Sequence, residues 1–151
     1  MPGYAELHCW SNFTFLEGAA HPEELVERAA ALGLAGLALT DRDGLYGAVR
    51  FTKAAAEPGF PAICGAELSV ALPRPSRLVL LVENAGGYAN LVELISIAQM
   101  RGRKRDARLH LDDLDGRTAG LITLSGWRSG LPERALLEGD EREARAICAR
   151  L

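Results

Sequence analysis

Short apolar runs bounded by turn residues alternate with helix-like segments along most of this 151-residue chain. This alternation is typical of βα repeats, in which helices connect the strands of a parallel sheet. The segment 22–33 is a clear helix: Pro22 suits the first turn, Glu23 and Glu24 favour the positive N-terminal end, and Gly33 ends it. The sequence therefore predicts an α/β fold of about five βα-type units.

The individual elements can be placed by their periodicity and their flanking turn residues. Strands are expected at residues 4–10, 34–41, 61–72, 76–84 and 120–126. Helices are expected at residues 21–33, 44–59 and 87–100, with one or two more over 131–151. With 48% hydrophobic and 25% charged residues, the chain lies in the ordinary globular range, so we expect one domain over residues 1–151.

Charge and hydropathy exclude several broad classes of partner. The net charge is −3, so the overall field gives no reason to expect tight binding to nucleic acid or to an acidic membrane. We see no basic-then-apolar leader and no run of about eighteen apolar residues, which predicts a cytoplasmic chain without a membrane partner. The three cysteines form no CxxC pair, so neither a disulfide framework nor a zinc ribbon is indicated.

One basic stretch interrupts the repeat, RGRKRDAR at residues 101–108. It contains Arg101, Arg103, Lys104, Arg105 and Arg108. Such a loop could hold phosphate groups of DNA. No aromatic residue is interleaved to stack bases and the flanking chain is acidic, so a solvated connector is the favoured interpretation and phosphate binding the alternative.

Chemistry-bearing residues gather where the expected strands end. In parallel α/β folds the functional groups lie at the carboxyl ends of the strands. The residues placed near these ends are His8, Trp10, Asp41, Arg42, Asp43, Glu67 and Trp127, whereas Arg77 opens the fourth expected strand. His8, Glu67 and an aspartate could ligate a metal ion, but arginine stays protonated and tryptophan has no lone pair to give. These donors are too few for the multinuclear site that phosphate ester hydrolysis commonly uses.

Simpler interpretations of the same residues stay open. His8 could be a satisfied histidine of the core. Glu67 could pair with Arg42 or Arg77. The stretch from Asp41 to Gly44 could be a turn that caps the second helix, since Asp and Gly are favoured there.

Several ordered motifs together resemble a known family. They are YAELHCWSNFTFLEGAAHPEEL, TDRDGLYGAVRF, PAICGAEL, RLVLLVENAGGYANLVELI and GLITLSG. The chain resembles the N-terminal polymerase and histidinol phosphatase (PHP) domain of bacterial DNA polymerase III alpha subunits, most nearly the error-prone form. The resemblance implies a parallel-stranded, distorted (βα)7-type barrel, of which this chain holds about the first five units. It also implies a metal cluster at the strand ends with phosphoesterase chemistry, including 3′-to-5′ removal of nucleotides.

The resemblance carries over to individual residues. His8 and Glu67 match family ligands, Glu17 stands where an aspartate is usual, and Asp41 belongs to the same motif as Arg42. Four positions depart from the pattern: Trp10, Arg42 and Arg77 stand where the family has histidines, and Trp127 where it has a cysteine. None of the four can bind a metal, so we expect no cofactor, and zinc or manganese if there is one.

The resemblance therefore predicts a catalytically inactive, metal-free PHP module with a structural or interaction role in a DNA replication or repair protein. Two alternatives are a residual metal-dependent phosphoesterase or nuclease, and a phosphate or single-stranded DNA binding module. The family's barrel continues beyond this length, so we expect an excised piece, or a shortened relative that pairs with another copy. The expected partner is the remainder of a polymerase alpha-type chain or a second copy.

Overall fold

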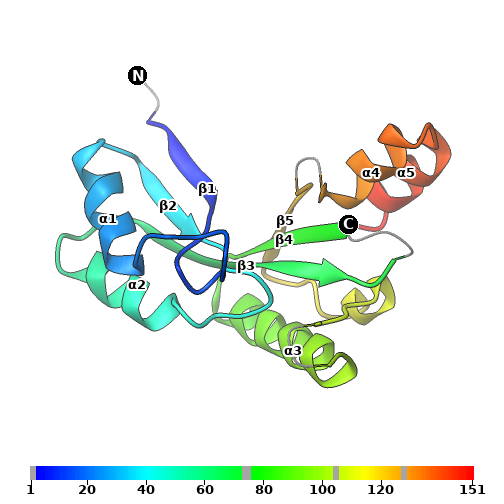
Figure 1. The fold of residues 1–151 in the computed structure, drawn as a ribbon, viewed down its shortest axis with the longest axis horizontal. Coiled ribbons are helices and arrows are strands. Elements are labelled where there is room, and N and C mark those ends of the chain that lie inside the picture. Colours follow the sequence, from blue (N-terminus) through cyan, green and yellow to red (C-terminus); the bar gives the residue numbers. More distant parts are fainter. Residues whose placement is uncertain (1–2, 73–75, 104–105, 127–128) are drawn as a thin grey trace.

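The computed structural model describes residues 3–72, 76–103, 106–126 and 129–151 (Figure 1). Its strands form one sheet in the order β1-β2-β3-β4-β5. The bounds of the strands are β1 Ala5–Cys9, β2 Gly36–Leu39, β3 Ala62–Val70, β4 Ser76–Val82 and β5 Leu121–Leu124. The five expected strands and the mixed α/β class are therefore confirmed.

The direction of β4 differs from the parallel arrangement that the sequence predicted. Strands β1, β2 and β3 are parallel, but β4 is antiparallel to β3, and β5 is antiparallel to β4. The interval between Val70 and Ser76 is too short for the crossover helix that a parallel connection requires. The prediction of a uniformly parallel sheet was wrong for β4, because the sequence shows no helix between the third and fourth strands.

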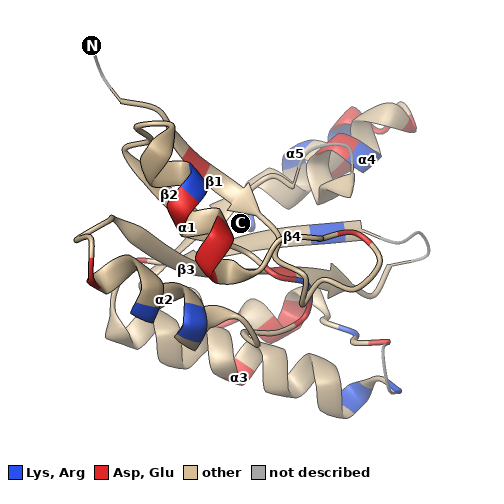
Figure 2. Ribbon diagram, turned by 60° about the vertical axis from the view of Figure 1, so that its left-hand side comes forward, with Lys and Arg blue, Asp and Glu red and all other residues tan. Residues whose placement is uncertain are grey.

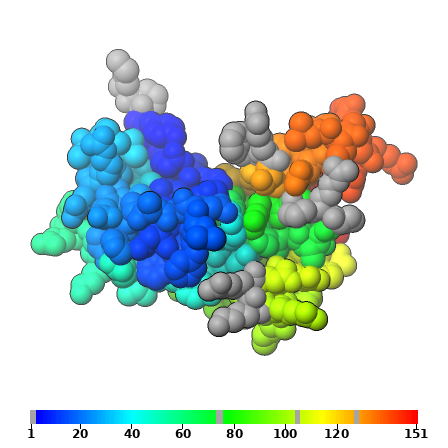
Figure 3. Space-filling model, in the orientation of Figure 1, coloured from blue at the N-terminus to red at the C-terminus, as the bar shows by residue number. Residues whose placement is uncertain are grey.

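Two groups of helices lie at opposite ends of the sheet, with a longer helix below it (Figure 1). The helices are α1 Pro22–Ala31, α2 Ala48–Ala56, α3 Ala85–Arg101, α4 Leu131–Leu137 and α5 Glu141–Cys148. A short 3-10 helix, η1, covers Leu111–Leu114 and was not expected from the sequence. Figure 3 shows the lobe of β1, α1 and α2 in blue and cyan, the α4–α5 lobe in orange, and green strands between them.

Separate hydrophobic cores lie in different parts of the fold. The larger core lies between β3, β4, α3 and the C-terminal helices, and includes Leu68, Leu80, Leu91 and Leu94. A smaller core under α1 and α2 is built around Phe51, which is completely buried. No helix among the described residues is both long and apolar enough to cross a bilayer.

The antiparallel direction of β4 determines which residues meet at the carboxyl ends of the first three strands. Arg77 lies at the start of β4 and is in register with Ser69, near the end of β3. If β4 ran parallel to β3, its first residues would lie beside the amino ends of β1, β2 and β3. The antiparallel direction therefore brings Arg77 to the carboxyl ends of β1, β2 and β3.

Candidate functional site

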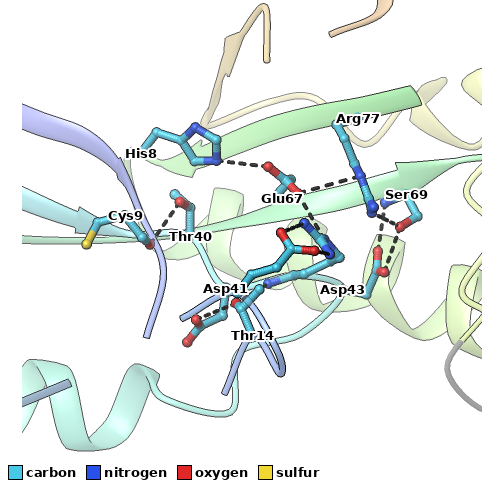
Figure 4. Close-up of polar contacts among 11 residues, drawn as sticks. His8, Cys9, Thr14, Thr40, Asp41, Asp43, Glu67, Ser69 and Arg77 are labelled. Atoms are coloured by element: carbon cyan, nitrogen blue, oxygen red, sulfur yellow. Dashed lines mark hydrogen bonds and ion pairs between the residues drawn. The ribbon is translucent and has the colours of Figure 1, made fainter. Parts of the chain in front are cut away.

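A buried carboxylate, Glu67 on β3, lies at the centre of the polar contacts at these strand ends (Figure 4). Only 3% of its surface is exposed. Its Oε2 lies 2.9 Å from Nε2 of His8, and its Oε1 accepts a hydrogen bond of 3.1 Å from Nε of Arg42. Nε of Arg77 lies 3.7 Å from the same Oε1. The structure thus unites His8, Arg42 and Glu67, which the sequence placed at separate strand ends, and adds Arg77 from the start of β4.

The electrostatics of this cluster favour an ionised Glu67. Burial raises the pKa of the Glu67 carboxyl, but hydrogen bonds from His8 and Arg42 and the charges of Arg42 and Arg77 outweigh burial and leave the pKa below its ordinary value. The carboxylate is therefore satisfied by nitrogen donors of the protein itself. The sequence-based interpretation in which Glu67 pairs with an arginine agrees with this geometry.

Arg42 joins the buried carboxylate to a second one at the surface. Its two terminal nitrogens donate to the two carboxylate oxygens of Glu17, at 2.5 Å each. Hydrogen bonding to Glu17, with Glu67 also contributing, raises the pKa of the Arg42 guanidinium above its ordinary value, although burial acts in the opposite direction. Arg42 is thus a fixed cation held between two carboxylates.

Trp10 forms an apolar side of the same cluster. Cζ of Arg42 lies 5.3 Å from the centroid of the Trp10 ring, within the range of a cation–π contact. The rings of Trp10 and His8 meet edge to face, with centroids 5.4 Å apart. Trp10 therefore contributes packing to the arginine and the histidine, and no metal-ligating atom.

Asp41 braces the loop that follows β1. It is 1% exposed and accepts hydrogen bonds from the backbone N–H of Ser11 at 2.7 Å, from Oγ of Ser11 at 2.7 Å and from Oγ1 of Thr14 at 2.8 Å. Oγ1 of Thr14 in turn accepts from the backbone N–H of Arg42. Both oxygens of Asp41 are thus used to fix the loop.

Asp43 plays a similar role on the other side of the cluster. Its carboxylate accepts from the backbone N–H and from Oγ of Ser69, both at 2.7 Å, and Arg77 donates to the same hydroxyl. Helix α2 begins after Gly47, with no side-chain cap. The interpretation of residues 41–44 as a cap of the second helix was therefore wrong, because Asp41 binds the loop after β1 and Asp43 binds Ser69 on β3.

The residues at this site do not fit a metal cluster of the kind that the family resemblance implies. The described part of the chain contains no group of three or more His, Cys, Asp or Glu side chains placed to hold one ion. The oxygens of Glu67 and Asp41 are engaged by N–H and O–H donors, and Arg42 brings a positive charge to the centre. Trp127, the fourth departure from the family pattern, lies outside the described residues.

The basic stretch lies elsewhere and is partly paired. Arg101 donates to Asp113 and to the backbone carbonyl of Arg108, while Arg108 pairs with Asp106. A hydrogen bond from Arg101 lowers the pKa of Asp113 to about 2, although burial acts in the opposite direction. Figure 2 shows basic and acidic residues interspersed over the ribbon. Within the part of the chain that the structure describes, Arg103 forms an isolated backbone bridge to Asp106, and Lys104 and Arg105 lie outside that part. Phosphate binding by this stretch stays a prediction.

Some contributors to the site were missed by sequence reasoning. Ser11, Thr14 and Ser69 supply hydroxyl groups that hold the two aspartates. A signal was present in SNFT, which follows the first strand, because Ser and Thr near an expected cluster of aspartates are natural donors.

A family model described as "PHP domain" matches residues 6–151. The chain is 43% identical over 148 residues to the error-prone DNA polymerase of Cutibacterium acnes, covering 90% of this chain and 13% of that one. It is 60% identical over 100 residues to the error-prone DNA polymerase of Anaeromyxobacter dehalogenans, covering 64% and 9%. The error-prone DNA polymerase of Mycobacterium bovis is 42% identical over 158 residues, covering 98% and 14%.

Solved structures resemble this fold. A Bifidobacterium adolescentis protein described as a metal-dependent phosphoesterase aligns with a TM-score of 0.53 at 22% identity, covering 99% of this chain and 55% of that one. An amidohydrolase from Chromobacterium violaceum, with bound sulfate and no metal, aligns with a TM-score of 0.51 at 26% identity, covering 96% and 54%. The described fold is thus about half of each of these chains.

Proposed function

This chain belongs to the PHP domain family, and on that premise we propose that it is a catalytically inactive, metal-free member. Its role is structural or interactive, within a larger chain of the error-prone DNA polymerase III alpha type. The observation that carries this proposal is the pairing of buried Glu67 with Arg42 and His8.

The chemistry of this pairing supports the absence of catalysis. Metal-dependent phosphoester hydrolysis needs a bound ion that generates a nucleophile and neutralises the phosphate. At this site the carboxylate that a cation would use is already neutralised by Arg42, whose guanidinium cannot be deprotonated or displaced without leaving a buried charge. The cluster therefore favours internal packing over ion binding.

The comparisons support the polymerase context. The chain spans between 9% and 14% of the length of the curated relatives reported above. We accordingly take residues 1–151 as a single, partial PHP domain and the remainder of a polymerase-type chain as its partner. A cytoplasmic location follows from the same proposal, since chromosomal DNA in bacteria lies there.

The two alternative functions have weaker support. A residual zinc- or manganese-dependent phosphoesterase would require His8, Glu67 and an acidic residue to be free, whereas Glu67 and Asp41 are engaged by donors. Phosphate binding by the basic stretch would use Arg101, which already pairs with Asp113.

Elemental analysis of the purified chain for zinc, manganese and iron, prepared without chelator, tests the proposal. We expect less than stoichiometric metal, and no metal-dependent hydrolysis of a phosphomonoester or of a 3′-terminal nucleotide. The matched variant combines Trp10→His, Arg42→His and Arg77→His. Metal binding by this variant would show that the backbone still places these positions as a metal site requires. One or more tightly held ions in the unaltered chain would overturn the proposal.

A further inference from the structure

The loop between β1 and α1 presents two neighbouring apolar side chains to solvent. Phe15 is 75% exposed and Leu16 is fully exposed. Single exposed hydrophobic residues are common on protein surfaces and need no explanation. Two large ones at the tip of one loop form a projection, which we call the Phe15–Leu16 tip.

The backbone of this tip is held in an unusual conformation. Leu16 has a φ of 69°, in the left-handed region that residues other than glycine, asparagine and aspartate rarely adopt. Such conformations persist where the surrounding structure imposes them, and they cluster at functional contacts. A loop under no such requirement would place glycine there.

The loop is braced on both sides of the tip. Before it, Ser11 and Thr14 donate to the buried carboxylate of Asp41. After it, the backbone N–H groups of Glu17 and Gly18 donate to the carbonyl of Thr14. An exposed apolar tip on a rigid support loses little conformational entropy on binding, which is the property of a preorganised contact surface.

The cluster around Glu67 supplies part of this brace. Arg42 contacts buried Glu67 through Nε and contacts Glu17, the residue after Leu16, through both terminal nitrogens. The cation therefore ties the loop to the end of β3. The cluster around Glu67 thereby helps to fix the position of the Phe15–Leu16 tip.

We propose that the Phe15–Leu16 tip docks into an apolar pocket on the part of the polymerase-type chain that lies outside these 151 residues. This inference rests on the proposed function and names the surface through which that interaction role is exercised. The choice of docking partner follows from the length of the relatives. At least 86% of each relative's chain lies outside the region matched here. Burying a phenylalanine and a leucine together provides the apolar anchor that such interfaces use.

The test compares this chain alone with a full-length chimera. In the chimera, the chain replaces the matching region of the Cutibacterium acnes error-prone DNA polymerase. Amide hydrogen exchange is measured on peptides covering residues 11–20 in both proteins. We expect exchange in the chimera to be slower by about tenfold or more, since docking removes the loop from solvent.

A double variant, Phe15→Ser with Leu16→Ser, tests the side chains themselves. It should lower the melting temperature of the chimera and leave that of the isolated chain unchanged, because both side chains are exposed there. Leu32→Ser is the control: Leu32 is 57% exposed at the C-cap of α1, shortly before β2 begins, and its substitution should affect both proteins equally.

A binding experiment with two separate fragments tests the same docking if the chimera assembles poorly. The 151-residue chain and the remaining polymerase chain are produced separately, and the double variant should raise their Kd by about tenfold or more. Equal exchange of the loop in both proteins, or an unchanged Kd in the double variant, would overturn the docking proposal. Metal content, measured on the same chimera, tests the proposed metal-free function independently of docking. The docking proposal and the proposed function can therefore fail separately.

Discussion

Nε of Arg42 donates a hydrogen bond of 3.1 Å to Oε1 of Glu67, which joins the loop after β2 to the buried end of β3. Glu67 has almost no contact with solvent, so its charge depends on this donor, on His8 and on the nearby charge of Arg77. A carboxylate buried in this way is costly unless every partner is in place.

Removing the arginine should therefore be strongly destabilising. We expect Arg42→Ala to lower the free energy of unfolding by about 3–5 kcal/mol, the usual cost of leaving one partner of a buried pair uncompensated. Urea denaturation measures this change. Arg50→Ala is the control, because Arg50 pairs with Glu23 at the surface and should cost about 1 kcal/mol or less. Adding Glu67→Gln to Arg42→Ala should recover part of the loss, and no recovery would contradict this account.

Asp41 should stabilise the loop after β1. In Asp41→Asn the carboxylate that accepts from Ser11 and Thr14 becomes a weaker acceptor and gains N–H groups without partners. We expect a loss of about 2–3 kcal/mol in unfolding free energy, with faster proteolysis of the loop. Asp112→Asn changes an exposed carboxylate and should have little effect. Similar stability of the two variants would show that Asp41 is not a brace.

Acid should destabilise the fold over a defined range of pH. The pKa values of Glu67 and Asp113 are lower in the folded chain than their ordinary values of 4.5 and 3.8, so their contribution is complete above those values and is lost as pH falls through the folded pKa. Burial outweighs the hydrogen bonds of Asp43 to Ser69 and raises the pKa of this carboxyl. Protonation of Asp43 at low pH therefore stabilises the fold and opposes the effect of Glu67 and Asp113. We expect the net effect to be a falling urea midpoint between pH 4.5 and about 2.

Arg101→Ala isolates one part of that acid response. Without the guanidinium, the pKa of Asp113 returns toward 3.8, so the decline between pH 3.8 and about 2 should become shallower. Parallel curves for the variant and the unaltered chain would mean that this pair does not contribute.

The cysteines should differ in reactivity. Burial, with smaller contributions from the charges of Glu6 and Asp41, raises the pKa of the Cys9 thiol from 9.0 to about 11. A rise of this size reduces the thiolate by about a hundredfold at neutral pH. Alkylation followed by mass spectrometry should label exposed Cys148 first and Cys9 slowly, with Cys9 accelerating on unfolding in urea. Rapid labelling of Cys9 in the folded chain would contradict this burial.

The sequence by itself determined the five strands, the main helices and the family, although not the short helix η1. Helix α1 and strand β2 follow from periodicity and from local end signals such as Pro22 and Gly33, which act within a few residues. The sequence also predicts departures from the family's ligands at Trp10, Arg42 and Arg77, because neither tryptophan nor arginine can ligate a metal whatever the fold.

Only the tertiary structure decided how those residues are used. The direction of β4 brings Arg77 beside Glu67, and the position of the loop after β1 lets Arg42 reach Glu17 as well as Glu67. Contacts between residues this far apart in sequence arise from packing of the whole sheet and leave no periodic signal in the chain. Local chemistry thus predicted which groups would stand at the strand ends, and three-dimensional packing determined which of them pair.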